Sequence, residues 1–300
     1  MARPRIGLVL GSGGARGWCH IGVLRGLEGL GLRPDVIAGC SMGAVVGAAY
    51  AAGRLDALED WTREMTRARL VRLLDVRLSS GGLVEGRHIT EVLAELGLPD
   101  SFDALDMPFV AVATDLETGR EIWLQSGDLG AAVRASAALP GIISPYRHQG
   151  RWLLDGGLTN PVPVSAARAL GADIIIAANP NAKRHGRLWR APDPEPAIWQ
   201  GLADALPDAV QDQLSALLPT PEDGPRAPNY LEVVSIAIDV MTEQIRRSRL
   251  AGEPPHVLLN ADLGEMSVLD LHRAPVAIDE GRRMVERQAE HLRDLIEGAG

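Results

Sequence analysis

Short apolar runs alternate with segments of helical periodicity along the first 180 residues of the chain. The earliest run, Ile6–Leu10, is typical of a buried strand, and apolar residues then recur at positions 21, 24 and 27, on one face of a helix. The same reasoning predicts strands over 35–41, 109–114, 121–125, 151–154 and 174–178. Because helical segments separate most of these strands, we expect an α/β fold with three layers, α/β/α, and a largely parallel central sheet.

Local patterns add detail to this outline. The pair Thr118-Gly119 between two of the strands predicts a hairpin. Amphipathic spacing predicts one helix over 56–75 and another over 276–296, with a strand at 257–259 before the second.

A proline-rich stretch interrupts the periodic pattern. Residues 180–228 hold nine of the twenty prolines, which favours an insertion or lid with at most one helix, near 203–218. No other break suggests a second domain. We expect a single domain over 1–300, with its core at about 6–179, the insertion at about 180–230, and C-terminal helices and a strand over 231–300.

Composition excludes several classes of protein. The chain is 46% apolar and 23% charged, and its net charge is −9, from 30 basic and 39 acidic residues. Such a composition is not that of a disordered, collagen-like or multi-span membrane protein. The acidic balance also argues against nucleic acid as a partner, because non-specific binding needs a basic footprint.

One charge-free segment and the cysteines bear on location. Residues 36–53 carry no charge, but they fall short of the roughly 20 residues that span a bilayer and are rich in small side chains. A buried strand, a tight turn and a buried helix explain them better. The five-residue apolar run near the N-terminus is shorter than a secretory signal requires. With only Cys19 and Cys40, neither a disulfide framework nor a metal site is expected, which favours a cytoplasmic protein.

The segment Gly39-Cys40-Ser41-Met42-Gly43 is the strongest chemical signal. It has the form Gly-x-Ser-x-Gly, follows an apolar strand and precedes a helix, which is the context that a nucleophile elbow requires. In such an elbow the glycines permit a tight turn, and the helix N-terminus directs its N–H groups at the site. A glycine-rich packing turn is the alternative interpretation.

A second glycine-rich segment, Gly11-Ser12-Gly13-Gly14-Ala15-Arg16-Gly17, follows the first strand. Arg16 occupies the place where a dinucleotide-binding fingerprint needs glycine, and the Lys-Ser/Thr pair of a Walker loop is absent. What remains is a row of unhindered backbone N–H groups that can hold an oxyanion. A glycine turn without a ligand is the alternative.

A serine nucleophile needs a base, and Asp155 is the best-placed candidate. It ends an apolar strand and enters Gly156-Gly157, which we interpret as the carboxyl edge where α/β sites form. A carboxylate with a pKa near 4 is a weak base, so we expect partial burial to raise the pKa of Asp155. An Asp that only caps a turn is the alternative. Six histidines follow Ser41, but none has a sequence context that singles it out: His88, His148, His185, His256, His272 and His291.

Taken in order, these motifs resemble the patatin-like phospholipase family, whose members are lipid acyl hydrolases with a Ser-Asp dyad. The resemblance runs from about residue 6 to 178 and includes 134–141 and 155–163. A later stretch, 238–246 with 256–264, is similar to the bacterial branch that contains RssA-type proteins and the esterase domain of neuropathy target esterase.

The resemblance implies roles for individual residues. Ser41 would be the nucleophile and Asp155 the base, Gly13 and Gly14 would donate N–H groups to the oxyanion, and Arg16 would shape that loop. The remaining motif positions are all glycines: Gly11, Gly39, Gly43, Gly156 and Gly157. Ser12 stands where many members of the family have a third glycine, a mild departure because serine also offers a backbone N–H.

The expected function is therefore a serine acyl hydrolase, a phospholipase, lysophospholipase or esterase, acting on a lipid acyl ester through an acyl-enzyme. No cofactor or metal is expected, because no cluster of divalent-metal ligands appears. Two alternatives stay open: a Ser-His-Asp esterase of the α/β-hydrolase kind, and a regulatory or scaffold protein on the same fold. The basic segment 183–190 contains Trp189 and suggests peripheral membrane contact, with an ordinary solvated loop as the alternative.

Overall fold

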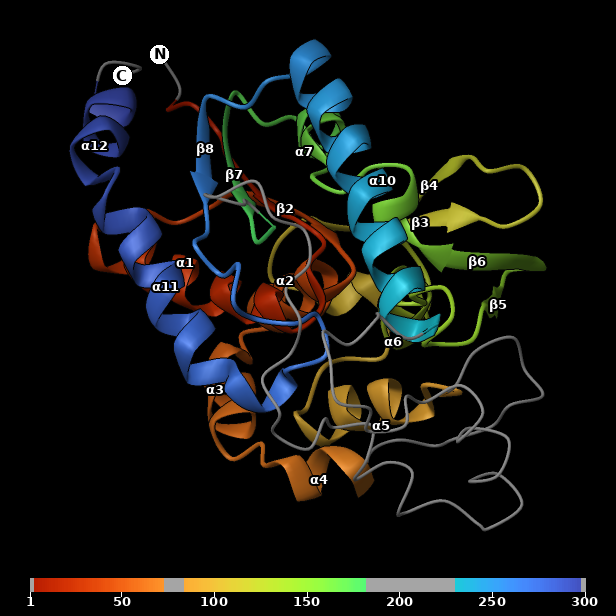
Figure 1. The fold of residues 1–300 in the computed structure, drawn as a ribbon. Helices are drawn as coiled ribbons and strands as arrows, with labels where there is room; N and C mark the ends of the chain where they lie inside the picture. Colours follow the sequence, from red (N-terminus) through yellow and green to blue (C-terminus); the bar gives the residue numbers. More distant parts are fainter. Residues whose placement is uncertain (1–2, 73–83, 182–229, 298–300) are drawn as a thin grey trace, which may run out of the picture.

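The computed structural model describes residues 3–72, 84–181 and 230–297, and its centre is one mixed β-sheet (Figure 1). The order of the strands is β5-β6-β3-β2-β1-β7-β8, and β4 also pairs with β3. The strands are β1 (Ile6–Leu10), β2 (Val36–Cys40), β3 (Phe109–Asp115), β4 (Glu121–Leu124), β5 (Tyr146–His148), β6 (Arg151–Asp155), β7 (Ile174–Asn179) and β8 (Val257–Asn260). Strands β3, β2, β1, β7 and β8 run parallel, whereas β4 and β6 are antiparallel to β3.

The α-helices of the described residues surround this sheet. They are α1 (Cys19–Gly29), α2 (Met42–Ala51), α3 (Leu55–Arg63), α4 (Arg67–Arg72), α5 (Arg87–Glu95), α6 (Leu129–Ser136), α7 (Val164–Ala169), α10 (Tyr230–Gly252), α11 (Ala274–Glu286) and α12 (Ala289–Glu297). Three-residue and five-residue 3₁₀ turns connect some of them, including η1 (Gly14–Trp18) and η3 (Gly156–Leu158). The predicted helix near 203–218 and the basic segment 183–190 lie outside the described residues.

Alternation along the strands divides the core into two clusters, one on each face of the sheet. In β1, Leu8 and Leu10 face the cluster that includes residues of α1, α2 and α11. Val9 faces the opposite cluster, which includes residues of α7. Side chains that alternate between the two faces are the expected result of the period of two along a strand. The prediction of an α/β fold with a largely parallel central sheet and helices on both sides is therefore confirmed.

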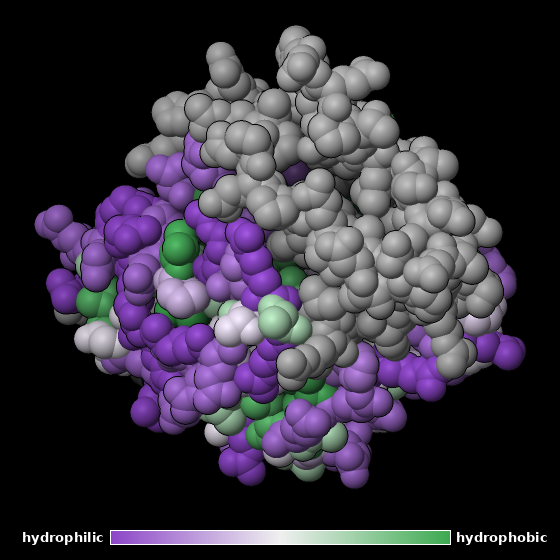
Figure 2. Space-filling model, turned by 60° about the horizontal axis from the view of Figure 1, so that its bottom comes forward, coloured by the Kyte–Doolittle hydropathy of each residue, from purple (hydrophilic) through white to green (hydrophobic). Residues whose placement is uncertain are grey.

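The charge-free segment 36–53 forms β2 and α2, as expected for a strand, a turn and a helix. Among the residues described, no helix combines the length and apolar character that crossing a bilayer requires. In the view of Figure 2, the described surface is mainly hydrophilic, and hydrophobic residues gather in small patches between hydrophilic ones.

Two predicted helices are each divided in the structure. The expected helix over 56–75 was wrong as one element, because α3 ends at Arg63 and α4 begins at Arg67. The hydroxyl of Thr66 accepts a hydrogen bond from the N–H of Arg69, which caps a new helix start. The helix expected over 276–296 is divided into α11 and α12. There the N–H of Gln288 bonds the carbonyl of Val285, a tightened last turn.

The predicted hairpin at Thr118-Gly119 is confirmed, since β4 pairs antiparallel with β3. Strand β5 was missed, because it has only three residues and lacks an apolar run. It pairs antiparallel with β6 across a turn in which Gln149 has a φ of 48°. Figure 1 shows these edge strands at the right-hand side of the molecule, away from α1 and α11.

Candidate active site

Ser41 lies in a strained turn between β2 and α2. Its φ of 57° and ψ of −123° place a side-chain-bearing residue in a backbone region that such residues rarely occupy. The N–H of Ser41 donates to the hydroxyl of Ser136 at 2.9 Å, and that hydroxyl donates to the carbonyl of Val112 at 2.6 Å. Ser136, on α6, thus ties the turn to β3, a support that sequence reasoning missed.

Close packing explains the glycine two residues after Ser41. A Cβ atom on Gly43 would overlap the carbonyl of Leu10, so only glycine lets α2 begin this close to the end of β1. On the other side of the turn, a Cβ atom on Gly39 would stand 2.5 Å from the carbonyl oxygen of Gly43. The turn therefore brings β1, β2 and the start of α2 into direct contact.

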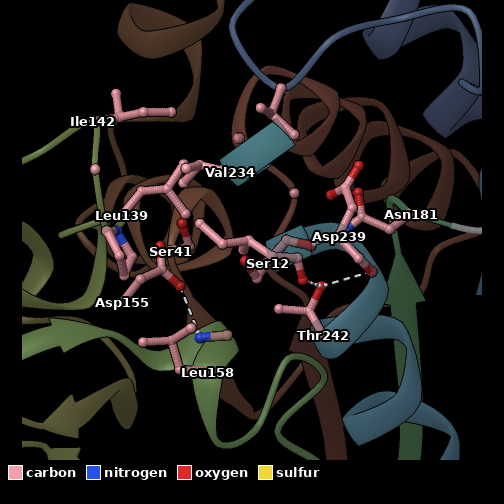
Figure 3. A pocket seen from close by; sticks show the side chains of 17 residues that line it. Ser12, Ser41, Leu139, Ile142, Asp155, Leu158, Asn181, Val234, Asp239 and Thr242 are labelled. Carbon is pink, nitrogen blue, oxygen red and sulfur yellow. Dashed lines mark hydrogen bonds between the residues drawn. The ribbon is translucent and has the colours of Figure 1, made fainter. Parts of the chain in front are cut away.

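Asp155 reaches the same site from the other side of β3. Its strand β6 runs antiparallel to β3, yet Asp155 lies at the carboxyl ends of the parallel strands, where the sequence predicted it. The register pairs Asp155 with Ala113 and Cys40 with Val112, so Ser41 and Asp155 approach each other from opposite sides of β3. In Figure 3 their side chains lie next to each other at one end of the cavity.

Burial dominates the electrostatics of Asp155, which is 1% exposed. Burial raises its pKa to about 6, while the hydroxyls of Ser41 and Ser12 and the N–H of Gly157 act in the opposite direction. Oδ1 accepts the Gly157 N–H at 2.7 Å. Oδ2 has no hydrogen bond of ordinary geometry within the described part of the chain, although the two hydroxyls are close enough to influence the carboxylate. The expected rise in pKa is confirmed in direction.

Several N–H groups of the glycine loop already have acceptors. The N–H groups of Gly11, Ser12 and Ala15 bond carbonyls of other segments at 3.0, 2.8 and 2.8 Å. Across the described ranges, the N–H groups of Gly13 and Gly14 have no acceptor. Both residues line the same cavity as Ser41 and Asp155. The structure thus brings the two predicted donors to the predicted nucleophile.

Arg16 is buried and does not line this cavity. Its Nε donates to the carbonyl of Met266 at 2.7 Å, its Nη1 to Oδ1 of Asn181 at 2.8 Å, and its Nη2 to Asp239 at 3.4 Å. Arg16 therefore connects the glycine loop with the end of β7, with α10 and with the segment before α11.

Gly156 and Gly157 begin the η3 turn directly after Asp155.

Known proteins are similar to this chain over most of its length. A sequence model described as patatin-like phospholipase matches residues 8–168. An NTE family protein of Mycobacterium tuberculosis is 34% identical over 96% of this chain and 92% of its own. This chain belongs to the patatin-like phospholipase family.

Other relatives are similar to part of the chain. Patatin-like phospholipase domain-containing protein 6 of Homo sapiens is 34% identical over 57% of this chain, which matches 13% of that longer protein. Among solved structures, VipD from Legionella pneumophila has a TM-score of 0.45 at 12% identity, covering 95% of this chain and 67% of that one. Membership of the patatin-like phospholipase family supports lipid acyl hydrolase activity in general terms.

The cavity of this patatin-like domain is small and has two kinds of wall. Its volume is about 40 Å³. Apolar side chains line one part: Leu139, Ile142, Leu158, Val234, Ile238 and Val268. Asn181, Asp239 and Thr242 line the other part, and Figure 3 shows them across Ser12 from the Ser41 end. Sequence reasoning missed the contribution of α10, because its residues are about 190 positions from Ser41.

The histidines of the described chain do not line the cavity. His20, fully buried, bonds the carbonyl of Gly11 through Nε2 at 2.8 Å, and burial lowers its pKa to about 4. His256 accepts the N–H of Ile175, and His88 bonds Glu91. His185 lies outside the described residues. In the same described residues, no group of three His, Cys, Asp or Glu side chains is arranged to hold a metal ion.

Proposed function

We propose that this protein is a serine acyl hydrolase that cleaves lipid acyl esters, such as those of phospholipids and lysophospholipids, through a Ser41-Asp155 dyad. One observation carries the proposal. Ser41, held in a strained elbow, lies beside a buried carboxylate whose pKa is raised to about 6, and both share a cavity with two backbone N–H groups that have no acceptor among the described residues. Nucleophile, base and oxyanion donors are the three elements that acyl transfer needs.

The reaction follows from this geometry. Ser41 Oγ attacks the ester carbonyl while Asp155 Oδ2, which has no hydrogen bond of ordinary geometry in the described part of the chain, accepts the hydroxyl proton. The N–H groups of Gly13 and Gly14 stabilise the negative oxygen, each by about 3–4 kcal/mol. Asp155 then donates its proton to the departing alcohol. In the second half, Asp155 takes a proton from water, which attacks the acyl group on Ser41. The bond between Ser41 Oγ and the acyl carbon then breaks, the acid leaves, and Asp155 returns the proton to Oγ.

The substrate class follows from the walls of the cavity. The apolar side chains from the loop after α6 and from α10 suit an acyl chain, and the polar end near Asn181 suits the alcohol part of the ester. Cys19 and Cys40 are buried and unpaired, which suits an enzyme of the cytoplasm. Such an enzyme would reach its lipid substrate by peripheral membrane contact.

The test is hydrolysis of p-nitrophenyl butyrate and lysophosphatidylcholine by the purified full chain, by Ser41→Ala and by Asp155→Asn. We expect both variants to lose at least about 10³-fold in kcat, because each removes a participant in every turnover. The matched controls are Ser126→Ala and Asp103→Asn, which make the same changes at exposed positions and should retain full activity.

The outcomes separate the alternatives. If only Ser41→Ala loses activity, Asp155 is not the base, and the alternative of a Ser-His-Asp triad is favoured. Activity that survives Ser41→Ala would contradict the proposed nucleophile. A wild type without activity on either ester, combined with a Ser41→Ala variant that keeps its cellular effect, would favour the regulatory alternative.

A further inference from the structure

Three successive carbonyl groups of the glycine loop accept hydrogen bonds. The pairs are His20 Nε2 with Gly11 O at 2.8 Å, Asn181 Nδ2 with Ser12 O at 2.8 Å, and Arg16 N with Gly13 O at 3.2 Å. Each peptide group has a carbonyl on one side and the N–H of the next residue on the other. The orientation of a carbonyl therefore decides where the following N–H points.

The peptide between Ser12 and Gly13 is the one that matters for an oxyanion. The described chain contains no cis peptide, so the carbonyl of Ser12 and the N–H of Gly13 point in opposite directions. Asn181 binds the carbonyl. The N–H of Gly13 is consequently directed away from Asn181, and it is one of the two loop N–H groups without an acceptor in the described structure.

The loop itself does little to fix this peptide. Gly13 has no side chain to restrict its φ, so the peptide before it can rotate at low cost. The side-chain amide of Asn181 supplies the constraint from the far end of β7. Figure 3 shows Ser12 between Asn181 on one side and the Ser41 end of the cavity on the other.

Arg16 determines which way the amide of Asn181 faces. A guanidinium can only donate hydrogen bonds, so Nη1 of Arg16 selects Oδ1 of Asn181, at 2.8 Å. The NH₂ group of the amide is then left for the carbonyl of Ser12. Arg16 is itself anchored by Met266 and by Asp239, at 2.7 and 3.4 Å.

We infer that Asn181 is a positioning residue: it orients the Ser12–Gly13 peptide so that the Gly13 N–H faces the reacting carbonyl, and Arg16 acts through Asn181. This inference rests on the proposed function, because it assigns the oxyanion loop its support. It also gives Arg16 a reason to lie in the loop without lining the cavity.

Asn181→Asp tests the inference with minimal change of shape. The carboxylate keeps an acceptor for Arg16, but it replaces the donor to Ser12 with an oxygen that repels the carbonyl. We expect kcat for p-nitrophenyl butyrate to fall roughly 10- to 100-fold, less than the 10²–10³-fold loss that follows removal of an oxyanion donor. KM should stay within about twofold. Asn260→Asp, at the end of β8, is the matched control, because the new carboxylate still accepts from Asn179 and lies away from the cavity.

A transition-state analogue separates positioning from a general structural effect. A short-chain alkyl trifluoromethyl ketone forms a hemiketal oxyanion with the nucleophile, so its affinity for Asn181→Asp should fall by the same factor as kcat. An Arg16→Ala, Asn181→Asp double variant should lose no more than the more damaged single variant, since both act on one peptide.

Specific results would overturn the inference. Unchanged kcat and inhibitor affinity in Asn181→Asp, with Ser41→Ala inactive, would remove the role of Asn181 and leave the proposed function intact. A loss of kcat without a loss of inhibitor affinity would show a structural effect instead. Wild-type hydrolysis that survives Ser41→Ala would overturn the proposed function and this inference together.

Discussion

Two residues of the candidate active site, Ser41 and Asp155, have features that lower the stability of the fold. Ser41 has a strained backbone, which costs on the order of 1–3 kcal/mol. Asp155 is a buried carboxylate that bonds one N–H through Oδ1 and leaves Oδ2 without a hydrogen bond of ordinary geometry among the described residues. Backbone strain and a buried carboxylate of this kind cluster at functional sites. The two features therefore indicate an active site independently of the similarity to known proteins.

The raised pKa of Asp155 predicts how activity depends on pH. Burial raises this pKa to about 6, and only the charged form accepts a proton from Ser41. We expect kcat/KM for p-nitrophenyl butyrate to be level above about pH 7 and to fall roughly tenfold for each pH unit below about 6. The measurement is a pH–rate profile at constant ionic strength, with p-nitrophenol read at its isosbestic wavelength. A profile that stays flat down to about pH 4 would contradict the predicted base.

At the scale of elements, helices α1 and α11 cross through two glycines. A Cβ atom on Gly22 of α1 would overlap the carbonyl of Ile278 on α11, and one on Gly281 of α11 would overlap the carbonyl of Cys19. The two backbones therefore touch, and apolar side chains of both helices join the same core cluster. The contact joins elements about 250 residues apart and attaches the C-terminal segment to the sheet.

Gly22→Ala should separate these two helices. The added methyl group has no space against a backbone carbonyl, so we expect the free energy of unfolding to fall by about 3 kcal/mol or more. Gly29→Ala is the control on the same helix, since a Cβ atom there meets nothing within 4 Å. Alanine should stabilise that position by roughly 0.5–1 kcal/mol. Urea unfolding followed by circular dichroism checks both, and equal stability of the two variants would contradict the close crossing.

At the scale of the whole molecule, carboxylates affect the pH dependence of stability in two opposite ways. Arginine partners and other donors lower the pKa values of Glu59, Glu243 and Glu280 below their ordinary 4.5, although burial opposes this. Their stabilising effect is present above pH 4.5 and is lost as the pH falls below it. Asp155 has the opposite effect on stability, because burial raises its pKa. Its charged form destabilises the fold above about pH 6, and protonation relieves this cost.

Asp155→Asn should therefore make the folded protein more stable at high pH while abolishing activity. A rise of the pKa from 3.8 to about 6 corresponds to at most about 3 kcal/mol of unfolding free energy. We expect the variant to unfold at higher urea concentration than wild type at about pH 8, with the difference shrinking towards about pH 4. Asp103→Asn, at an exposed position, should change neither value. An Asp155→Asn variant less stable than wild type at about pH 8 would show that the charge does not strain the fold.

The sequence by itself determined the features that depend on neighbouring residues. The strand before Ser41, the turn and the helix after it occupy 16 consecutive positions, so apolar pattern and glycine spacing suffice to predict them. The glycine loop after β1 and the Asp-Gly-Gly turn are local in the same sense. For this reason the pair Ser41 and Asp155 could be selected without coordinates.

Only the tertiary structure decided how these pieces meet. The antiparallel direction of β6, which brings Asp155 to Ser41, depends on pairing with β3 about 40 residues earlier. The hydrogen bond from Asn181 to Ser12 and the ion pair of Arg16 with Asp239 join residues 169 and 223 positions apart. Local patterns carry no record of such partners, because burial and hydrogen bonding between distant segments arise only when the chain closes around its sheet.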